Sequence, residues 1–412
     1  PNSGPSSSRT GRSHAQTPDL AAINGGLMIF RTGLAKGFPG RIHLAYRFEV
    51  LNTSRSVREF VFVDAQTGKV LDQITGSHTA LDRKVYEVAL DDLVWEDSAS
   101  NPSHPDPIIP GWDGGTEQQV TDWQNEIDGA RETYNLIASM TLGDWRSYDG
   151  NDATMLTINN EAEMGCPNAQ WDGVSTNYCS GVTGDDTVAH EWAHAYTEYT
   201  ADVIYQWQPG ALNESYSDVF GEVVDLLNGR GTDDPGILRT AEACSIYGSG
   251  SNRVDESYRW LSGEDDPGFG GAIRDMWRPT CYGDPGKVSD NQYWCTSGDF
   301  GGVHINSGIP NHGFALLVDG GSYNELEIVG LGLTKATHIY WESLQMLVPA
   351  SDFADQADAL EASCTNLIDI NLPALSTDQV SAGPSGELIT AEDCNSVAAI
   401  IDAIELREDP VQ

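Results

Sequence analysis

The residues of this chain best suited to chemistry lie between Asp186 and Asp225. Residues His190 to His194 read H-E-W-A-H, which places two histidines four positions apart with Glu191 between them. On a helix, residues four apart lie on one face, so both imidazoles can bind the same ion. Zinc accepts nitrogen ligands in tetrahedral sites, and a catalytic zinc site keeps one position open for water. The spacing therefore predicts a zinc site.

Glu214 is the predicted third ligand. It lies twenty positions after His194, and the helical spacing of apolar residues from 211 to 227 places it near the start of a second helix. Asp218 lies one turn further on and, with Asn213, is expected to accept the outer N–H of a ligand histidine. The predicted ligand set is thus two imidazoles and one carboxylate.

A chance match on an exposed helix is the alternative, because short motifs recur in unrelated proteins. Asp185 and Asp186 weigh against it, since carboxylates favour a helix start directly before the histidines. Glu191 follows His190 on the same helix and is not needed as a ligand. It is therefore predicted to be the general base that takes a proton from water and passes it to the leaving nitrogen of an amide.

The stretch resembles the thermolysin family of secreted zinc endopeptidases. A second block, residues 301–308, reads GGVHINSG and is similar to the family segment that carries a transition-state histidine. The resemblance extends over residues 85–362, with a weaker match upstream to the end of the family's pro-segment. It implies an α+β fold of two lobes, a mixed, β-rich N-terminal lobe and a helical C-terminal lobe, with the zinc helix between them.

The resemblance assigns catalytic roles outside the zinc motif. His304 and Tyr205 match the positions that stabilise the oxyanion of the tetrahedral intermediate. Asp299 matches the carboxylate that orients this histidine. Arg274 matches the arginine that holds the substrate carbonyl on the primed side.

The resemblance also implies where substrate binds. Asn168 and Ala169 match residues of an edge strand that pairs with the substrate backbone, and such pairing gives affinity without demanding a sequence. The family prefers an apolar residue just after the scissile bond. The pocket for that residue is expected to include Tyr178, Thr187 and Ile273.

Calcium is where the sequence departs from the family. The family's paired calcium site draws on carboxylates that match Asp186, Asp225 and Glu264. Arg259 and Leu261 occupy places that are usually acidic, and calcium needs six to eight oxygen ligands. We therefore expect one weakened calcium site at most, with Arg259 able to stand in for a lost cation.

Four segments are expected along the chain. Residues 1–25 are expected to be a disordered lead and residues 26–80 the end of a pro-segment. Residues 81–200 would form the N-terminal catalytic lobe with the zinc helix, and residues 201–412 the helical lobe. Alternating apolar residues at 42–50 and 58–64 predict strands, and 65–71 predicts a turn into a third. These strands resemble the end of the pro-segment; alternatively, they belong to a mature N-terminal sheet. A cut is predicted between about Ile74 and Leu81, where small polar residues favour proteolysis.

Further elements are predicted in the two lobes. Strands are expected at 84–88 and 155–158, an edge strand at 167–171, and helices at 120–138, 211–227, 314–318, 332–346 and 391–404.

The amino-acid composition limits which classes of partner and which cellular compartment fit this protein. Asp plus Glu total 62 against 22 Lys plus Arg, a net charge of −40, which argues against nucleic acids and anionic membranes as partners. We favour a simple explanation of this charge, in which the acidic surface keeps the protein soluble, as in salty surroundings. No apolar run approaches the roughly eighteen residues of a membrane span. The start lacks the apolar core of a signal peptide, so a processed or truncated end is expected.

Seven cysteines point to an oxidising, extracellular compartment. Their spacing indicates three disulfides, 166/179, 281/295 and 364/394, with Cys244 left over. Zinc ligation by cysteine is the alternative, but no C-x-x-C spacing occurs.

The sequence thus predicts a secreted, monomeric zinc endopeptidase that acts on protein or peptide substrates and interacts with its own pro-segment. A second hypothesis is a latent zymogen or binding module in which the pro-segment blocks the cleft. A third is an aminopeptidase, which shares the zinc motif but needs a carboxylate to capture the free amine; no such motif is found.

Overall fold

The computed structural model describes residues 20–32, 41–52, 58–75, 81–90, 92–97, 116–161, 164–232, 236–239 and 257–410. The chain divides into two compact units, an N-terminal unit of residues 1–79 and a C-terminal unit of residues 80–412. Within the described ranges, every helix is too short or too polar to cross a membrane.

The N-terminal unit is an antiparallel sheet in the order β1-β2-β3-β4, with strands at Leu20–Arg31, Ile42–Asn52, Arg58–Asp64 and Val70–Thr75. Its small core contains Phe30, Ala45 and Phe62, and the two phenyl rings stack with centroids 4.1 Å apart. The predicted strands at 42–50 and 58–64, and the third strand predicted after the turn, are confirmed as β2, β3 and β4.

The first strand corrects the predicted lead, because residues 20–25 belong to β1 and not to a disordered segment. The sequence Asn24-Gly25-Gly26 is typical of a turn. Here the pairing of β1 with β2 instead shifts register between Asn24 and Gly26, and Gly26 adopts a φ of 101°. A bulge of this kind lets a strand continue through glycine.

The C-terminal unit contains a five-stranded sheet in the order β6-β5-β7-β9-β8, with strands at Leu93–Glu96, Arg83–Glu87, Met155–Asn159, Thr176–Tyr178 and Ala169–Trp171. The central strands β5, β7 and β9 are parallel, whereas β6 and β8 pair antiparallel at the two edges. The predicted edge strand is therefore confirmed as β8. Its outer edge is left unpaired by this sheet, so an extended peptide can bind there.

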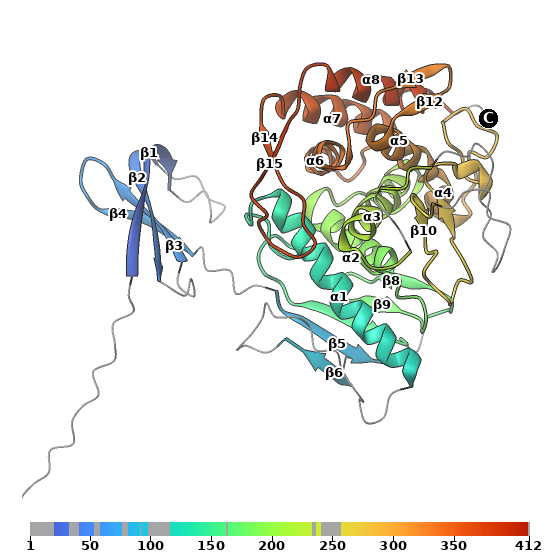
Figure 1. Cartoon of the computed structure of the whole chain (residues 1–412), viewed down its shortest axis with the longest axis horizontal. Helices are drawn as coiled ribbons and strands as arrows, with labels where there is room; N and C mark the ends of the chain where they lie inside the picture. Colours follow the sequence, from blue (N-terminus) through green and yellow to red (C-terminus); the bar gives the residue numbers. More distant parts are fainter. Residues whose placement is uncertain are drawn as a thin grey trace, which may run out of the picture. The chain divides into compact units, whose positions relative to one another are not determined.

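Helices make up most of the rest of this unit, at α1 Glu117–Met140, α2 Asp185–Thr200, α3 Trp207–Asn228, α4 Asp299–Asn306, α5 Gly308–Asp319, α6 Leu333–Leu344, α7 Phe353–Asn366 and α8 Asp393–Ala403. A 3-10 turn (η2, Pro279–Cys281) and three strand pairs complete it, at β10 Leu261–Ser262 with β11 Arg274–Asp275, β12 Gly321–Tyr323 with β13 Leu326–Ile328, and β14 Asn371–Pro373 with β15 Pro384–Leu388. Figure 1 shows α1 lying along the sheet and α5 to α8 grouped on the side of α3 away from it. The two predicted lobes are present, with α2 between them.

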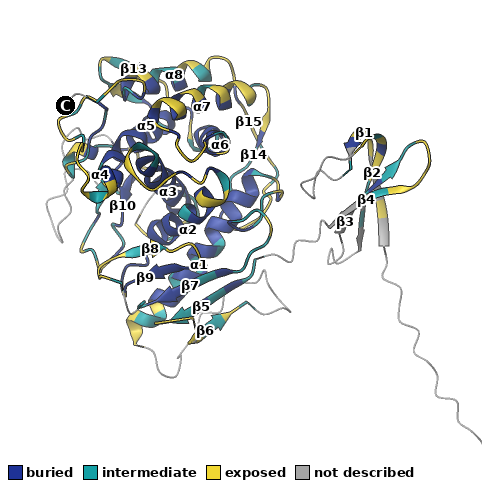
Figure 2. Ribbon diagram, turned by 180° about the vertical axis from the view of Figure 1, so that it is seen from behind, coloured by how far each residue is buried: buried dark blue, intermediate teal, exposed yellow. Residues whose placement is uncertain are grey.

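Helix α2 packs between α1 and α3 (Figure 2), and both neighbours approach it through glycine. A Cβ atom on Gly129 of α1 would lie 2.5 Å from Val188, and one on Gly221 of α3 would lie 2.8 Å from the backbone oxygen of Asp186. Neither position has room for a side chain. The zinc-motif helix is therefore held at close range on two sides.

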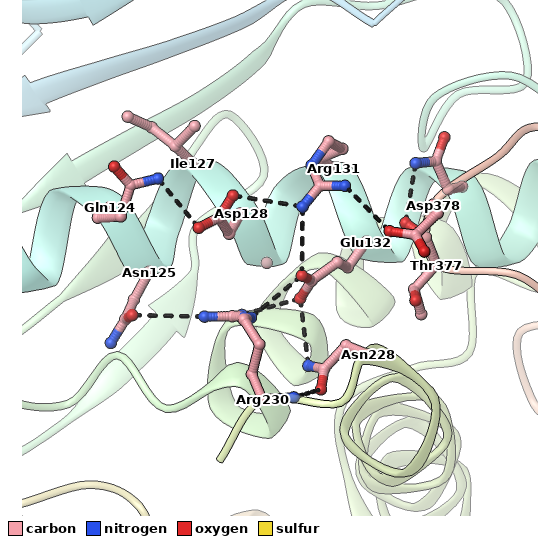
Figure 3. A network of polar contacts seen from close by, with 12 residues as sticks. Gln124, Asn125, Ile127, Asp128, Arg131, Glu132, Asn228, Arg230, Thr377 and Asp378 are labelled. Atoms are coloured by element: carbon pink, nitrogen blue, oxygen red, sulfur yellow. Dashed lines mark hydrogen bonds and ion pairs between the residues drawn. The ribbon is translucent and has the colours of Figure 1, made fainter. Parts of the chain in front are cut away.

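A polar network also ties the three helices together, and Figure 3 shows the part of it between α1 and the end of α3. Arg230, just after α3, donates from Nη2 to Glu132 of α1 at 2.8 Å, and Asn228 donates to Glu132 at 3.2 Å and to Asp185 of α2 at 2.7 Å. Burial raises the pKa of Glu132, although Arg230 opposes that rise. This network fixes the end of α3 against the start of α2.

Two of the predicted disulfides are present and one is wrong. Cys166 bonds to Cys179 beside β8 and β9, and Cys364 of α7 bonds to Cys394 of α8. Cys281 is disulfide-bonded, but Cys295 carries a free, exposed thiol, so the predicted 281/295 pair does not form. The prediction for Cys244 lies outside the described residues.

Candidate active site

The two histidines of the zinc motif meet as predicted on one face of α2. Their rings lie 4.6 Å apart between centroids, and the two Nε2 atoms are 3.0 Å apart. Nδ1 of His194 donates to Oδ1 of Asn213 at 2.5 Å, and Nδ1 of His190 lies 2.8 Å from Oδ1 of Asp218. Because each Nδ1 faces an acceptor, each Nε2 is the ring nitrogen that is available to bind a metal ion.

Glu214 of α3 completes this set. Its carboxylate oxygens lie 3.5 Å from Nε2 of His190 and 3.6 Å from Nε2 of His194. Ligand atoms of a tetrahedral zinc site are about 3.3 Å apart, given metal–ligand bonds of about 2.0–2.1 Å. One oxygen of this fully buried carboxylate also lacks a hydrogen-bond partner. The two imidazoles and Glu214 therefore fit zinc in donor type and in spacing.

The electrostatics of the three donors suit a cation. Burial opposes ionisation of Glu214, but His304, His194 and His190 outweigh it and hold the pKa of Glu214 well below its usual range. Burial lowers the pKa of His194 to about 4. Burial lowers the pKa of His190, but the nearby carboxylates of Asp218 and Glu214 outweigh this effect and raise that pKa to about 10.

Asp218 lies behind the metal ligands and contacts several polar groups at once. Besides His190, it accepts from Nε and Nη2 of Arg274 at 2.8 and 2.5 Å and from Nδ2 of Asn311 at 2.7 Å. Burial opposes its ionisation, but Arg274 and His190 hold the pKa of Asp218 far below its usual value. Asn311 was not predicted, although it lies seven positions after His304, two turns along the α4–α5 segment.

Glu191 lies beside the metal ligands without belonging to them. It is 5% exposed, one carboxylate oxygen has no hydrogen-bond partner, and its ligand atom is within 4.8 Å of those of His190 and His194. Burial raises the pKa of Glu191 to about 7, against the opposing effect of His190. A carboxyl group with a pKa near neutrality can both accept and return a proton.

His304 and Tyr205 face the same centre from the other side. Nε2 of His304 lies 3.3 Å from Glu214 and 3.2 Å from the hydroxyl of Tyr205, which itself donates to Glu214. Nδ1 of His304 lies 2.6 Å from Oδ1 of Asp299, whose Oδ2 accepts from the His304 amide at 3.0 Å. Glu214 raises the pKa of His304, and burial raises that of Tyr205. Both groups therefore carry protons to donate.

Three consecutive residues of α4 adopt left-handed backbone angles, and this turn of the chain brings Asp299 back to His304. Phe300, Gly301 and Gly302 have φ angles of 50°, 99° and 82°. Cβ atoms on the two glycines would lie 2.5 Å from Trp207 and 2.6 Å from Trp294. Only glycine fits both the backbone angles and the space.

Two cavities flank the centre and share Asn168, Ala169 and His304 in their linings. The smaller, of about 170 Å³, includes Arg274 and the predicted pocket residues Thr187 and Ile273. The larger, of about 790 Å³, extends along β8. Tyr178 lines neither cavity: it is fully buried and donates to the backbone of Val188 at 3.4 Å, so its predicted pocket role is wrong.

The predicted calcium ligands lie near the start of α2. Cβ of Gly231 would lie 3.2 Å from Asp225 and 3.4 Å from Asp185, which places these carboxylates side by side. Asp186 accepts from the Gly263 amide at 2.5 Å. Among the described residues, the donor atoms of His190, Glu191 and His194 all lie within 4.8 Å of one another, and these acids form no such group. Calcium at Asp186, Asp225 and Glu264 thus stays a prediction.

Arg259 does not replace a cation there. Its guanidinium binds Asp319 through two bonds of 2.7 Å, and the same carboxylate accepts from Trp260 at 2.7 Å. The expectation that Arg259 stands in for calcium is therefore wrong, because an acid on α5 holds it.

Comparison with known proteins agrees with this geometry. Residues 201–375 match the model of the thermolysin metallopeptidase alpha-helical domain. The chain is 35% identical over 253 residues to bacillolysin of Brevibacillus brevis, covering 59% of this chain and 41% of that protein. It is 29% identical over 370 residues to an extracellular elastase of Staphylococcus epidermidis, covering 78% and 62%. The chain thus spans about two fifths of the length of the first of these relatives.

Among solved structures, the precursor of protealysin, a metalloproteinase from Serratia proteamaculans, shares the fold. The TM-score is 0.51 at 22% identity, covering 79% of this chain and 88% of that one. The domain match and the relatives support a thermolysin-like metalloprotease, and the shared fold agrees with them.

Proposed function

We propose that this protein is a zinc-dependent endopeptidase. The observation that carries the proposal is the convergence of His190, His194 and Glu214, whose donor atoms lie 3.0 to 3.6 Å apart. Glu191 and His304 stand on either side of them. Bound zinc would polarise a substrate carbonyl and acidify a water molecule.

The chain's own residues perform the proton transfers and bind the developing charge. Glu191, with its pKa near 7, takes a proton from the attacking water and returns it to the leaving nitrogen. The protonated His304 and the hydroxyl of Tyr205 donate to the oxyanion. Asp299 fixes the orientation of His304 through the 2.6 Å contact.

Substrate is proposed to bind along β8. The free edge of this strand pairs with an extended peptide, which Asn168 and Ala169 contact and whose carbonyl Arg274 holds. An apolar side chain after the scissile bond enters the smaller cavity, against Ile273, Phe269 and the methyl group of Thr187. The Thr187 hydroxyl is already engaged, because it donates to Asp266 at 2.6 Å.

Secretion is part of the proposal. Two disulfides fit an oxidising compartment, and one relative is by name an extracellular elastase. The buried acids around Asp186 and Asp225 are proposed to take one calcium ion at most. The protein is proposed to act as a monomer on protein or peptide substrates.

Residues 26–80 are proposed to be the end of a pro-segment. The division of the chain after Thr79 and the likeness to a precursor structure support this. The cut is proposed between about Ile74 and Leu81, and the uncut chain would be a latent form. N-terminal sequencing of active protein tests the proposal: a start near Leu81 supports it, whereas full activity in chains that start at Pro1 contradicts it.

The proposed activity itself is tested with the full chain, dialysed against a chelator and titrated with zinc. We expect cleavage of casein to appear as zinc approaches one equivalent and to vanish on chelation. Mass spectrometry of the products should show internal cuts. Release of single N-terminal residues alone would instead indicate an aminopeptidase.

A further inference from the structure

The larger cavity lies on the far side of the metal ligands from Arg274, beside β8 and the end of α2. Its lining includes Trp171, Tyr205 and Phe300, and three acids at Asp172, Glu198 and Asp202. We infer that this cavity binds a lysine or arginine side chain of the substrate, one or two residues before the scissile bond. The inference rests on the proposed endopeptidase function and adds a substrate class to it.

Aromatic rings contribute to the lining of this cavity. Trp171 is held by Tyr148 and Trp192, with ring centroids 5.3 and 5.9 Å away. Tyr205 and Phe300 meet edge to face at 5.7 Å. The faces of such rings attract cations and also cover the apolar stem of a long side chain.

A carboxylate is fixed at the edge of the Trp171 ring. The indole nitrogen of Trp171 donates to Oε2 of Glu198 at 2.7 Å. A cation above the indole would therefore meet the ring and a carboxylate that is already in place. Glu198 lies eight positions after His190 on α2, so its position is tied to the metal centre by the same helix.

The other two acids add negative charge and have no ion-pair partner among the described residues. Oδ1 of Asp172 accepts from the amides of Val174 and Ser175 at 2.8 Å each, which leaves the second oxygen for other partners. No described residue forms an ion pair with Asp172, Glu198 or Asp202, and no described lysine or arginine lines the cavity. The net charge of the chain, −40, attracts a cationic substrate further.

The smaller cavity has a different lining, because Arg274 lies there as the ion-pair partner of Asp218, together with the apolar side chains of Phe269 and Ile273. Charge selection is therefore expected on one side of the scissile bond only. The two cavities together favour a substrate with a basic residue before the cut and an apolar residue after it.

The test uses zinc-loaded, active protein and fluorogenic peptides that share one sequence with leucine after the cut. Lysine, arginine or their uncharged analogue norleucine is placed one or two residues before the cut, one position at a time. We expect kcat/KM for the basic peptide at one of these positions to exceed that for norleucine about three- to tenfold at low salt. The ratio should fall toward one as salt rises.

Variants locate the effect. In the double variant Glu198→Gln with Asp202→Asn, the ratio of basic to norleucine peptide should fall to about one. Asp402→Asn, which removes an exposed acid on α8, is the matched control and should keep the wild-type ratio. A wild-type ratio of one or less at both positions, or a ratio that the double variant leaves unchanged, overturns the inference. Failure to cleave any peptide would instead overturn the proposed function.

Discussion

Two groups of buried carboxylates lie along α2, and they differ in what surrounds them. Glu214 meets three imidazoles and is fully buried, yet its pKa lies well below the usual value. Asp186 and Asp266, near the start of the helix, are 4% and 1% exposed. Burial and neighbouring carboxylates raise the pKa of Asp186 well above its usual value, and burial raises that of Asp266 to about 7.

The comparison shows that burial alone does not decide whether a carboxyl group is charged. At the metal centre, cationic neighbours keep the carboxylate ionised and ready to bind an ion. At the helix start, acids crowd together and favour protons. The first group is built for chemistry, whereas the second destabilises the fold unless protons or cations neutralise it.

The largest expected effect comes from Glu191→Gln. This variant tests whether Glu191 acts as the general base and not as a metal ligand. Zinc should remain bound at one equivalent, while kcat falls about 10²–10⁴-fold because the base is lost. Metal analysis and peptide cleavage on the same sample measure both. Activity close to that of the wild type would refute the assigned role.

His304→Ala removes one of the cations that hold Glu214 ionised and one donor to the oxyanion. We expect kcat to fall about 10²–10³-fold with little change in KM, because the interaction forms mainly in the transition state. Steady-state kinetics separate the two constants. A rise in KM at constant kcat would indicate ordinary substrate binding.

Glu214→Gln replaces the carboxylate that faces the three imidazoles and is the proposed third zinc ligand. The zinc Kd should rise by more than about 100-fold, since second-shell changes alone cost about 10- to 100-fold. Competition with a fluorescent zinc chelator measures the Kd. Stoichiometric zinc after dialysis against a mild chelator would show that Glu214 is not the third ligand.

Asn311→Ala tests the hydrogen bond behind the ligands. Asp218 would lose one donor, at 2.7 Å, and zinc affinity should fall about 10-fold. Asn135→Ala is the matched control, since this buried asparagine of α1 donates to the backbone of Thr377 at 2.9 Å, away from the centre. Equal losses of zinc affinity in both variants would mean a general loss of stability.

Asp266→Asn has the smallest expected effect and tests the second carboxylate group. Because the folded-state pKa of Asp266 is raised to about 7, the folded state binds its proton more tightly than the unfolded chain. Wild-type stability therefore falls as pH rises from about 4 to 7. The variant should lose less, by on the order of 5 °C in Tm between pH 5 and pH 8.

Thermal unfolding with zinc present and no added calcium makes this measurement. Asp402→Asn serves again as the control and should keep the wild-type pH dependence. A pH dependence in Asp266→Asn identical to the wild type would show that the two carboxylate groups do not differ as described.

The sequence predicted the parts of the site that depend on local spacing. The two histidines on one face of α2, Glu191 beside them, and Asp218 one turn after Glu214 follow from helical periodicity. Asp299 and His304 lie five positions apart, but their contact depends on the left-handed run at residues 300–302. Resemblance assigned that pair its roles, and periodicity could not.

Features decided by long-range packing escaped prediction. Asn311 reaches Asp218 across 93 positions, and Arg259 reaches Asp319 across 60. Spacing alone paired Cys281 with Cys295, although the fold leaves Cys295 free. At β1 the composition of residues 1–25 misled, because residues 20–25 belong to a strand that continues through glycine as a bulge.

The glycines that flank α2 have a consequence for how the protein can evolve. Gly129 and Gly221 carry no functional group, yet a methyl group at either would collide with α2 at 2.5 or 2.8 Å. A displacement of about 1 Å in a catalytic group can cost about 100-fold in rate. Selection for the site therefore also acts at these two glycines. A lineage that keeps the metal ligands but replaces either glycine by a larger residue would displace α2 and lose the site.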